Sequence, residues 1–131
     1  MEINGEGLMS FSVLVVDDLE MMRQAIRDVL QKNGIRVAGE AYNGRAAVQM
    51  YNTLKPDVVL LDIMMPVMDG LEALRRLKSL DPDAKVIMCS SMSGQRYVLR
   101  AIQLGARDFI VKPFQAQRIV SSVRKAAGKD G

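Results

Sequence analysis

Apolar and polar residues are arranged along this chain in two kinds of segment. Short runs such as 13–16 (Val-Leu-Val-Val) and 58–61 (Val-Val-Leu-Leu) contain only aliphatic residues, which is typical of strands buried on both faces. Between the runs lie longer segments whose apolar residues recur every three or four positions, as Met22, Ile26 and Leu30 do, and this spacing predicts amphipathic helices. The two kinds of segment follow one another strictly, so strands and helices are expected to alternate.

Five strands and five helices are expected in this order. The strands cover 12–16, 36–41, 58–62, 85–89 and 109–111, and the helices cover 19–32, 45–54, 71–79, 95–104 and 115–127. Gly34 after the first helix and Gly105 after the fourth are typical helix stops. Alternation at these lengths implies right-handed βαβ crossovers. The predicted fold class is therefore α/β, a doubly wound parallel sheet with helices on both faces.

The composition fits one globular domain. The chain has 131 residues, of which 49% are hydrophobic and 25% charged. We expect a flexible lead-in at residues 1–10, the domain at 11–127 and a short tail at 128–131. The amino terminus has neither the basic nor the apolar region of a signal peptide, and no segment is apolar for long enough to span a bilayer. The expected location is therefore the cytoplasm, with no membrane contact.

The single cysteine and the charges narrow the classes of function further. Cys89 excludes an internal disulfide, and its apolar neighbours predict a buried and unreactive thiol. The net charge is +3, but Lys and Arg are spread over amphipathic segments and form no dense run. This distribution favours a solvated surface, so we expect no nucleic-acid binding.

Carboxylates follow two of the apolar strands directly. Asp62 ends the run at 58–61, and Asp17 and Asp18 end the run at 13–16. In an open parallel sheet, ligands bind beyond the carboxyl ends of the strands. If the two strands are neighbours, the carboxylates converge, and each like-charged pair about 4 Å apart costs roughly 4 kcal/mol at an effective dielectric constant near 20. A cation must offset this repulsion, and Mg²⁺ suits a set of oxygen ligands best.

Further polar residues follow the other strands, and together the motifs resemble a known family. They are Val15-Val16-Asp17-Asp18, Leu61-Asp62-Ile63-Met64-Met65-Pro66 with Asp69-Gly70, Cys89-Ser90-Ser91-Met92, and Asp108-Phe109-Ile110-Val111-Lys112-Pro113-Phe114. Each is weak alone, but in this order and spacing they are specific. From about Phe11 to Lys125 the chain resembles a response-regulator receiver domain of two-component signalling, of the single-domain chemotaxis (CheY-like) type. The resemblance implies a five-stranded, flavodoxin-like sheet of order 2-1-3-4-5, the order with which the flavodoxin-like family is described in general terms.

The resemblance also implies a role for each polar residue. Asp62 would be the nucleophile that takes a phosphoryl group from a histidine kinase. The magnesium ligands would be Asp17, Asp18, Asp62 and the backbone carbonyl of Met64. Lys112 and the hydroxyl of Ser90 would contact phosphoryl oxygens, so that the catalytic set is Asp62, Ser90 and Lys112. The bond before Pro113 would be cis, as in the family.

The partners implied are a phosphodonor and a downstream protein. We expect a monomeric switch in chemotaxis or flagellar motor control, with a binding face built from 95–104, 109–111 and 115–127. Phe109 lies on this face, three positions before Lys112, and has no hydroxyl to hold it at the surface. The arginines expected to meet an acidic partner there are Arg96, Arg100, Arg118 and Arg124. A phosphorelay shuttle that passes the group to a histidine phosphotransfer protein is the alternative.

Two enzyme classes also place acids at strand ends. P-loop nucleotidases require a Gly-x-x-x-x-Gly-Lys-Ser/Thr motif, which this sequence lacks. Phosphatases of the haloacid dehalogenase type require a second acid two residues after the nucleophile, where this chain has Met64. We therefore expect no enzyme activity beyond the chain's own phosphorylation and dephosphorylation.

The lifetime of the phosphorylated state is expected to depend on two methionines. Family members that hydrolyse their phosphate quickly tend to carry an amide or carboxylate two residues after the phosphorylated Asp or after the hydroxyl residue. This chain has Met64 and Met92 at those positions. A thioether accepts hydrogen bonds weakly and so orients water poorly. The resemblance therefore implies slow autodephosphorylation or dependence on a separate phosphatase.

Overall fold

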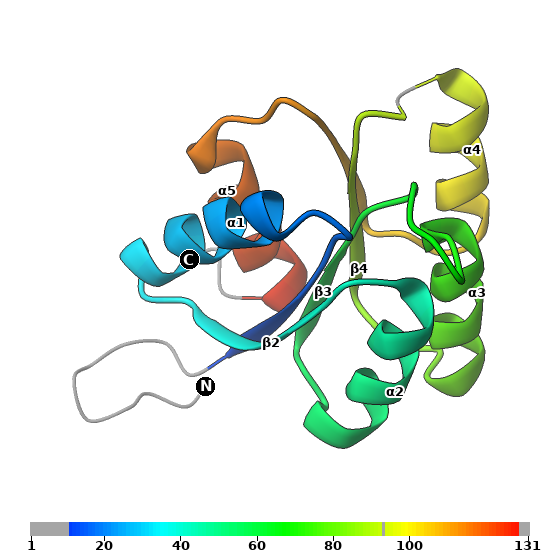
Figure 1. Ribbon diagram of the computed structural model, residues 1–131, viewed down its shortest axis with the longest axis horizontal. Helices are drawn as coiled ribbons and strands as arrows, with labels where there is room; N and C mark the ends of the chain where they lie inside the picture. The colour runs from blue at the N-terminus through cyan, green and yellow to red at the C-terminus, as the bar shows by residue number, and fades with distance from the viewer. Residues whose placement is uncertain (1–10, 93, 129–131) are drawn as a thin grey trace.

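The computed structural model describes residues 11–92 and 94–128, in which five strands alternate with five helices (Figure 1). The strands are β1 (Ser12–Val16), β2 (Arg36–Ala41), β3 (Val58–Leu61), β4 (Val86–Ser90) and β5 (Asp108–Val111). The helices are α1 (Glu20–Lys32), α2 (Gly44–Leu54), α3 (Gly70–Leu80), α4 (Gln95–Gln103) and α5 (Ala116–Ala127). The predicted lead-in at 1–10 and residues 129–131 of the predicted tail lie outside the described residues.

All five strands are parallel and form one sheet of order β2-β1-β3-β4-β5. This confirms the predicted fold class and strand order. Val16 pairs with Leu61 across β1 and β3, and the next backbone N–H, that of Asp62, donates to the Val16 carbonyl at 3.0 Å. The chain therefore leaves these two central strands at the same level, on the same edge of the sheet.

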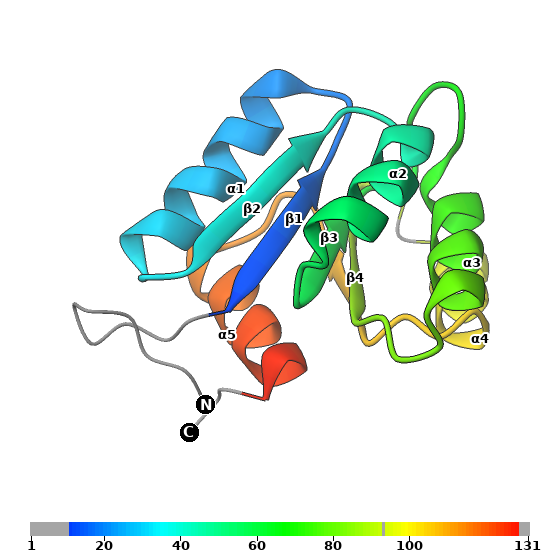
Figure 2. The same cartoon turned by 90° about the horizontal axis from the view of Figure 1, so that it is seen from below.

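Helices cover both faces of the sheet. Side chains of α1 and α5 pack on one face with Val13 and Val15 of β1, whereas those of α2, α3 and α4 pack on the other with Leu14 and Val16. Figures 1 and 2 show this division of the helices, with the sheet between them. Every residue of β1, β3 and β4 is buried. This explains why these strands appear in the sequence as continuous apolar runs.

The element ends differ from the sequence predictions by one residue at several places, and side-chain caps explain the starts of α2 and α3. Asn43 caps α2 by accepting from the N–H of Ala46 at 2.8 Å, and Asp69 caps α3 by accepting from Glu72 at 2.9 Å. Both helices therefore begin at the glycine after the cap. β4 ends one residue later than predicted, which puts Ser90 inside the sheet. No helix in the described ranges is both long and apolar enough to cross a membrane.

Candidate functional site

Three carboxylates meet at the carboxyl edge of the sheet. Carboxylate oxygens of Asp17, Asp18 and Asp62 lie within 4.8 Å of one another. The neighbouring positions of β1 and β3 bring them together, because Asp17 and Asp62 directly follow paired residues of these strands. Asp17 and Asp62 are buried, whereas Asp18 is exposed. The cluster is therefore closed on the protein side and open to solvent through Asp18.

A lysine from the far edge of the sheet lies between two of these acids. Lys112 follows β5, and its Nζ is 2.6 Å from Asp17 Oδ2 and 3.6 Å from Asp62 Oδ2. Its backbone N–H donates to the carbonyl of Ser90 at 3.0 Å, which ties the end of β5 to the end of β4. The Lys112–Pro113 bond is cis, as the resemblance implied. The ammonium group offsets part of the carboxylate repulsion, and its closer partner is Asp17.

The surroundings raise the pKa of both Asp62 and Lys112. Burial raises the pKa of Asp62, the Lys112 ammonium opposes this, and the charge of Asp17 adds to the rise, so that the pKa stays above its ordinary value. Hydrogen bonds from Ser90 and from the N–H of Ile63 favour the carboxylate. Burial lowers the pKa of Lys112, but its contacts with Asp17 and Asp62 outweigh burial and leave the pKa raised. A further cation beside Asp62 would favour its ionised form.

Ser90 lies at the end of β4 with a completely buried side chain. Its Oγ accepts a hydrogen bond from the N–H of Met92 at 3.1 Å, so the hydroxyl is held next to the loop that leads to α4. The preceding residue, Cys89, is buried, and burial raises the pKa of its thiol to about 12. This confirms the predicted burial of Cys89 and explains why the thiol should be unreactive.

The loop from Asp62 to α3 is closed by backbone hydrogen bonds. The N–H of Gly70 donates to the Ile63 carbonyl at 2.8 Å, and the N–H of Gly44 donates to the Met68 carbonyl at 3.0 Å. A Cβ at position 70 would lie 1.9 Å from the carbonyl oxygen of Asp62. Only glycine therefore fits between the end of β3 and the start of α3.

Methionines line this loop in two different environments. Met65 and Met68 pack against the core on the side of α2, α3 and α4, as expected for gap-filling side chains. Met64 instead exposes 59% of its surface, and Val67 has a left-handed backbone with φ of 70°. A β-branched residue is strained in that region, and such strain is concentrated at functional loops.

The sequence of residues 13–124 matches the response regulator receiver domain family. The chain belongs to this family. Its relatives include the chemotaxis protein CheY of Thermotoga maritima, which is 50% identical over 115 residues, 88% of this chain and 96% of the relative. The chemotaxis protein CheY of Bacillus subtilis is also 50% identical, over 117 residues, 89% of this chain and 98% of the relative.

Solved receiver structures share the fold. CheY in the CheX–CheY–BeF₃–Mg²⁺ complex from Borrelia burgdorferi has a TM-score of 0.87 and 32% identity, covering 94% of this chain and 93% of that chain. The response regulator domain of Thermotoga maritima CheB has a TM-score of 0.85 and 34% identity, covering 94% of this chain and all of that domain. The resemblance inferred from the motifs is thus confirmed. This chain is a two-component receiver domain with relatives in chemotaxis.

Two groups of contacts were missed from the sequence, one beside the acidic cluster and one at the start of β5. Arg23 of α1 donates from its guanidinium to the backbone carbonyl of Asp17 at 2.8 Å, and so holds the turn that presents the acids. At the other edge of the sheet, Asp108 accepts from Arg118 at 2.7 and 2.9 Å and from Ser122 at 2.7 Å. Arg118 therefore holds the pKa of Asp108 well below its ordinary value, and burial only partly opposes this. Arg23 and Arg118 lie on amphipathic helices like the other arginines of α1 and α5, so nothing in the sequence indicated their contacts.

Proposed function

We propose that this receiver domain is a phosphorylation-dependent switch that accepts a phosphoryl group from a histidine kinase on Asp62. The observation that carries the proposal is the convergence of Asp62 with Asp17, Asp18 and Lys112 at one edge of the sheet. The switch acts in chemotaxis or flagellar motor control, because relatives that are 50% identical over nearly their whole length are named chemotaxis proteins. Its proposed location is the cytoplasm.

In the proposed reaction an oxygen of Asp62 attacks the phosphorus of a phosphohistidine. The new oxygen–phosphorus bond replaces the phosphorus–nitrogen bond, and the imidazole leaves with a proton from solvent. Lys112 moves from Asp17 to an oxygen of the phosphoryl group on Asp62. This movement is short, because the Lys112 Nζ already lies 3.6 Å from Asp62 Oδ2. The hydroxyl of Ser90 rotates away from the Met92 N–H and donates to another phosphoryl oxygen.

The acidic cluster fits a magnesium ion. Three carboxylates within 4.8 Å of one another supply the hard oxygen donors that Mg²⁺ prefers, and the exposed side of Asp18 leaves room for its waters. Asp17, Asp18, Asp62 and the carbonyl of Met64 would hold the ion. When bound, Mg²⁺ neutralises charge on the phosphoryl oxygens. The CheY structure from Borrelia burgdorferi contains both Mg²⁺ and beryllofluoride, which supports such a site in this family.

Label transfer from a histidine kinase tests the proposed function. The ³²P of an autophosphorylated kinase is expected to appear on this protein only when Mg²⁺ is present. The labelled protein is then mixed with flagellar motor switch components and with histidine phosphotransfer domains. Retention of label with tighter binding to the switch component supports the proposal, whereas rapid transfer to the phosphotransfer domain supports a shuttle. Rapid turnover of p-nitrophenyl phosphate would instead identify a phosphatase.

Removal of Asp18 is expected to abolish most Mg²⁺ binding. Asp18→Ala takes one of three carboxylates from the cluster, so the Mg²⁺ dissociation constant measured by isothermal titration should rise at least about tenfold. Labelling by acetyl phosphate should fall with it. Asp28→Ala removes an exposed carboxylate of α1 outside the cluster and serves as the matched control. Equal Mg²⁺ affinity in the parent and Asp18→Ala would show that the ion is held elsewhere.

Polar side chains at positions 64 and 92 are expected to shorten the phosphorylated state. Met64→Asn and Met92→Glu each supply a group that can orient the attacking water, and should speed loss of label about tenfold, part of the 10²–10⁴ typical of such assistance. A pulse-chase measures the rates. Leu80→Asn, at the exposed far end of α3, is the control. Equal rates of label loss in the parent and in all variants would mean that the two methionines pack against their neighbours without affecting hydrolysis.

Activation is expected to change the face made by α4, β5 and α5. Beryllofluoride with Mg²⁺ mimics the phosphoryl group, and the largest amide NMR shifts should include Phe109, which is half-buried at the edge of the core. Asp62→Asn, which offers beryllofluoride no carboxylate, is the control. Shifts confined to α1 and α2 would refute this face.

A further inference from the structure

The turn between β1 and α1 carries Asp17 and Asp18, two of the three clustered acids. The N–H of Asp17 donates to the Ala41 carbonyl of β2 at 3.1 Å, and Asp17 Oδ1 accepts from the N–H of Leu19 at 3.0 Å. The Asp17 carbonyl accepts no backbone N–H from the described part of the chain, and its donor is the guanidinium of Arg23, 2.8 Å away. The orientation of the peptide group between Asp17 and Asp18 therefore depends on a side chain of α1.

An acid of β2 holds Arg23 in place. The Arg23 Nε lies 3.4 Å from Glu40 Oε1, and Glu40 Oε2 accepts from Arg27 Nη1 at 2.7 Å. Only 16% of the Arg23 side chain and 26% of the Glu40 side chain are exposed, so solvent screens their attraction less than it screens pairs at the open surface. The planar guanidinium of Arg23 thus bonds the Asp17 carbonyl through one nitrogen and faces Glu40 through another.

Through this contact the edge strand β2 is linked to the acids that follow β1. Glu40 pairs in register with Val15 of β1, two residues before Asp17. Figure 2 shows α1 running alongside β2, and the ion pairs of Glu40 cross this interface. β2 carries none of the three clustered acids, yet it holds the arginine that holds their turn.

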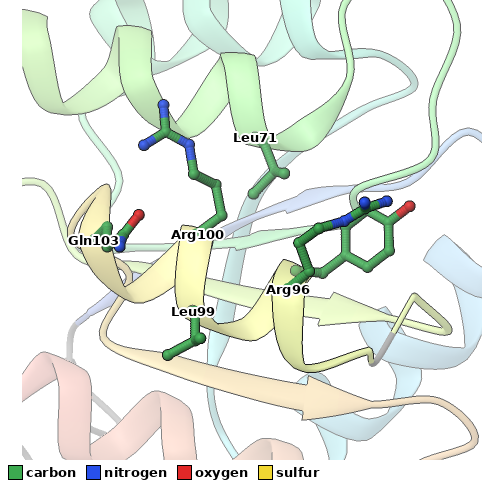
Figure 3. A pocket seen from close by; sticks show the side chains of 6 residues that line it. Leu71, Arg96, Leu99, Arg100 and Gln103 are labelled. Carbon is green, nitrogen blue, oxygen red and sulfur yellow. The ribbon is translucent and has the colours of Figure 1, made fainter.

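Two kinds of exposed arginine provide a contrast with Arg23. Arg75 and Arg76 pair with Glu72 of their own helix, and exposed pairs of this kind contribute little. Figure 3 shows Arg100 on α4 pointing toward α3, and it forms no ion pair within residues 11–92 and 94–128. Arg23 instead is half-buried and contacts both a second element and the backbone of a clustered acid.

We propose that Arg23 and Glu40 are positioning residues that set the affinity of the acidic cluster for Mg²⁺. This rests on the proposed function, in which Asp17 and Asp18 are ligands of the ion. Rotation of the peptide group that joins the two acids would move their carboxylates, which lie within 4.8 Å of each other and of Asp62. Arg23 prevents this rotation, and Glu40 acts through Arg23. Neither side chain is itself a ligand.

Isothermal titration with Mg²⁺ tests the proposal. Arg23→Met keeps the aliphatic stem and should raise the Mg²⁺ dissociation constant about tenfold, as is typical for residues that orient metal ligands. Loss of a positive charge alone would favour a bound cation, so weaker binding cannot come from the charge. Arg23→Lys keeps the charge, but a single ammonium does not span both acceptors, so it should also weaken binding. This milder change decides the test if Arg23→Met does not fold.

A double-mutant cycle tests whether Glu40 acts through Arg23. Glu40→Gln should raise the Mg²⁺ dissociation constant of the parent, because Arg23 loses its acid. In the Arg23→Met background the same change should have little further effect, since the contact is already absent. Equal effects of Glu40→Gln in both backgrounds would show that its charge, and not Arg23, carries the effect, and would overturn the role of Glu40.

Amide hydrogen exchange reads the turn without any metal. In Mg²⁺-free Arg23→Met, the N–H groups of Asp17 and Leu19 should lose most of their protection, because the turn that they bond is released. Arg27→Met is the matched control: it also takes an arginine from Glu40 but does not touch the turn. Its protection and Mg²⁺ affinity should stay close to the parent's. Arg100→Met removes the same charge at a distance and should likewise change neither.

Several results would overturn the proposal. They are parent-level Mg²⁺ affinity or parent-level exchange in Arg23→Met, Mg²⁺ affinity in Arg23→Lys equal to the parent's, and the same losses in Arg27→Met as in Arg23→Met. Failure of the proposed function is distinguishable. A parent that takes no label from a histidine kinase, but whose Mg²⁺ affinity falls in Arg23→Met, would refute the proposed function and leave the role of Arg23 intact. A parent that binds no Mg²⁺ would overturn both.

Discussion

Asp62→Asn is expected to lose phosphorylation by acetyl phosphate and Mg²⁺ at least about 10³-fold, because an amide cannot replace the carboxylate nucleophile. The change keeps the local geometry, since the side-chain oxygen can still accept the N–H of Ile63, which is 2.8 Å away in the parent. Burial and the charge of Asp17 already disfavour a negative charge at this position. The neutral amide should therefore not lower the urea concentration at which half of the protein is unfolded. Intact-protein mass spectrometry measures the added phosphoryl group.

Two comparisons complete this test. Asp28→Asn makes the same chemical change on the exposed surface of α1 and should be phosphorylated like the parent. Peptide mapping of the phosphorylated parent should locate the group on the segment that contains Asp62. Phosphorylation of Asp62→Asn at the parent's level would assign the nucleophile to another residue.

Gly70→Ala is expected to cost about 3 kcal/mol of unfolding free energy, at the upper end of typical overpacking penalties. The added Cβ would lie 1.9 Å from the Asp62 carbonyl oxygen and 2.8 Å from the Ile63 Cα, and these are backbone atoms that no rotamer change can move away. Relief requires α3 to move away from the end of β3. Phosphorylation should therefore slow as well, since Asp62 belongs to the displaced backbone.

Gly94→Ala is the control for this substitution. Its Cβ would first meet the Tyr97 ring at 3.6 Å, an ordinary contact, and replacing a glycine cap by alanine costs at most about 1 kcal/mol. Urea unfolding measures both variants. Equal unfolding free energies for Gly70→Ala and the parent would mean that the loop between β3 and α3 adapts without cost.

The elements that could be predicted from the sequence are those controlled by local chemistry. The apolar runs of β1, β3 and β4 predicted buried strands because both faces of each are covered by helices. Strand-end placement of Asp17 and Asp62 followed from the same runs. The element ends were less certain, because a cap such as Asn43 acts through one hydrogen bond to a specific N–H.

Features made by residues distant in sequence could not be predicted in this way. Nothing in the spacing indicates that Lys112 lies closer to Asp17 than to Asp62, because that choice depends on how three strands pack. The pairing of Arg118 with Asp108 likewise requires α5 to be placed against β5 first. The sequence located the acidic cluster, and the structure was needed to show which of its carboxylates Lys112 approaches most closely.

The bond between Lys112 and Asp17 joins residues 95 positions apart, and it has a consequence for synthesis on the ribosome. The acids Asp17, Asp18 and Asp62 are translated well before the lysine, and β5 must pair with β4 before Lys112 can reach them. Pairings between distant strands form late, because a long loop must close first. A nascent chain that ends before β5 therefore holds the three carboxylates without the ammonium group that offsets part of their repulsion.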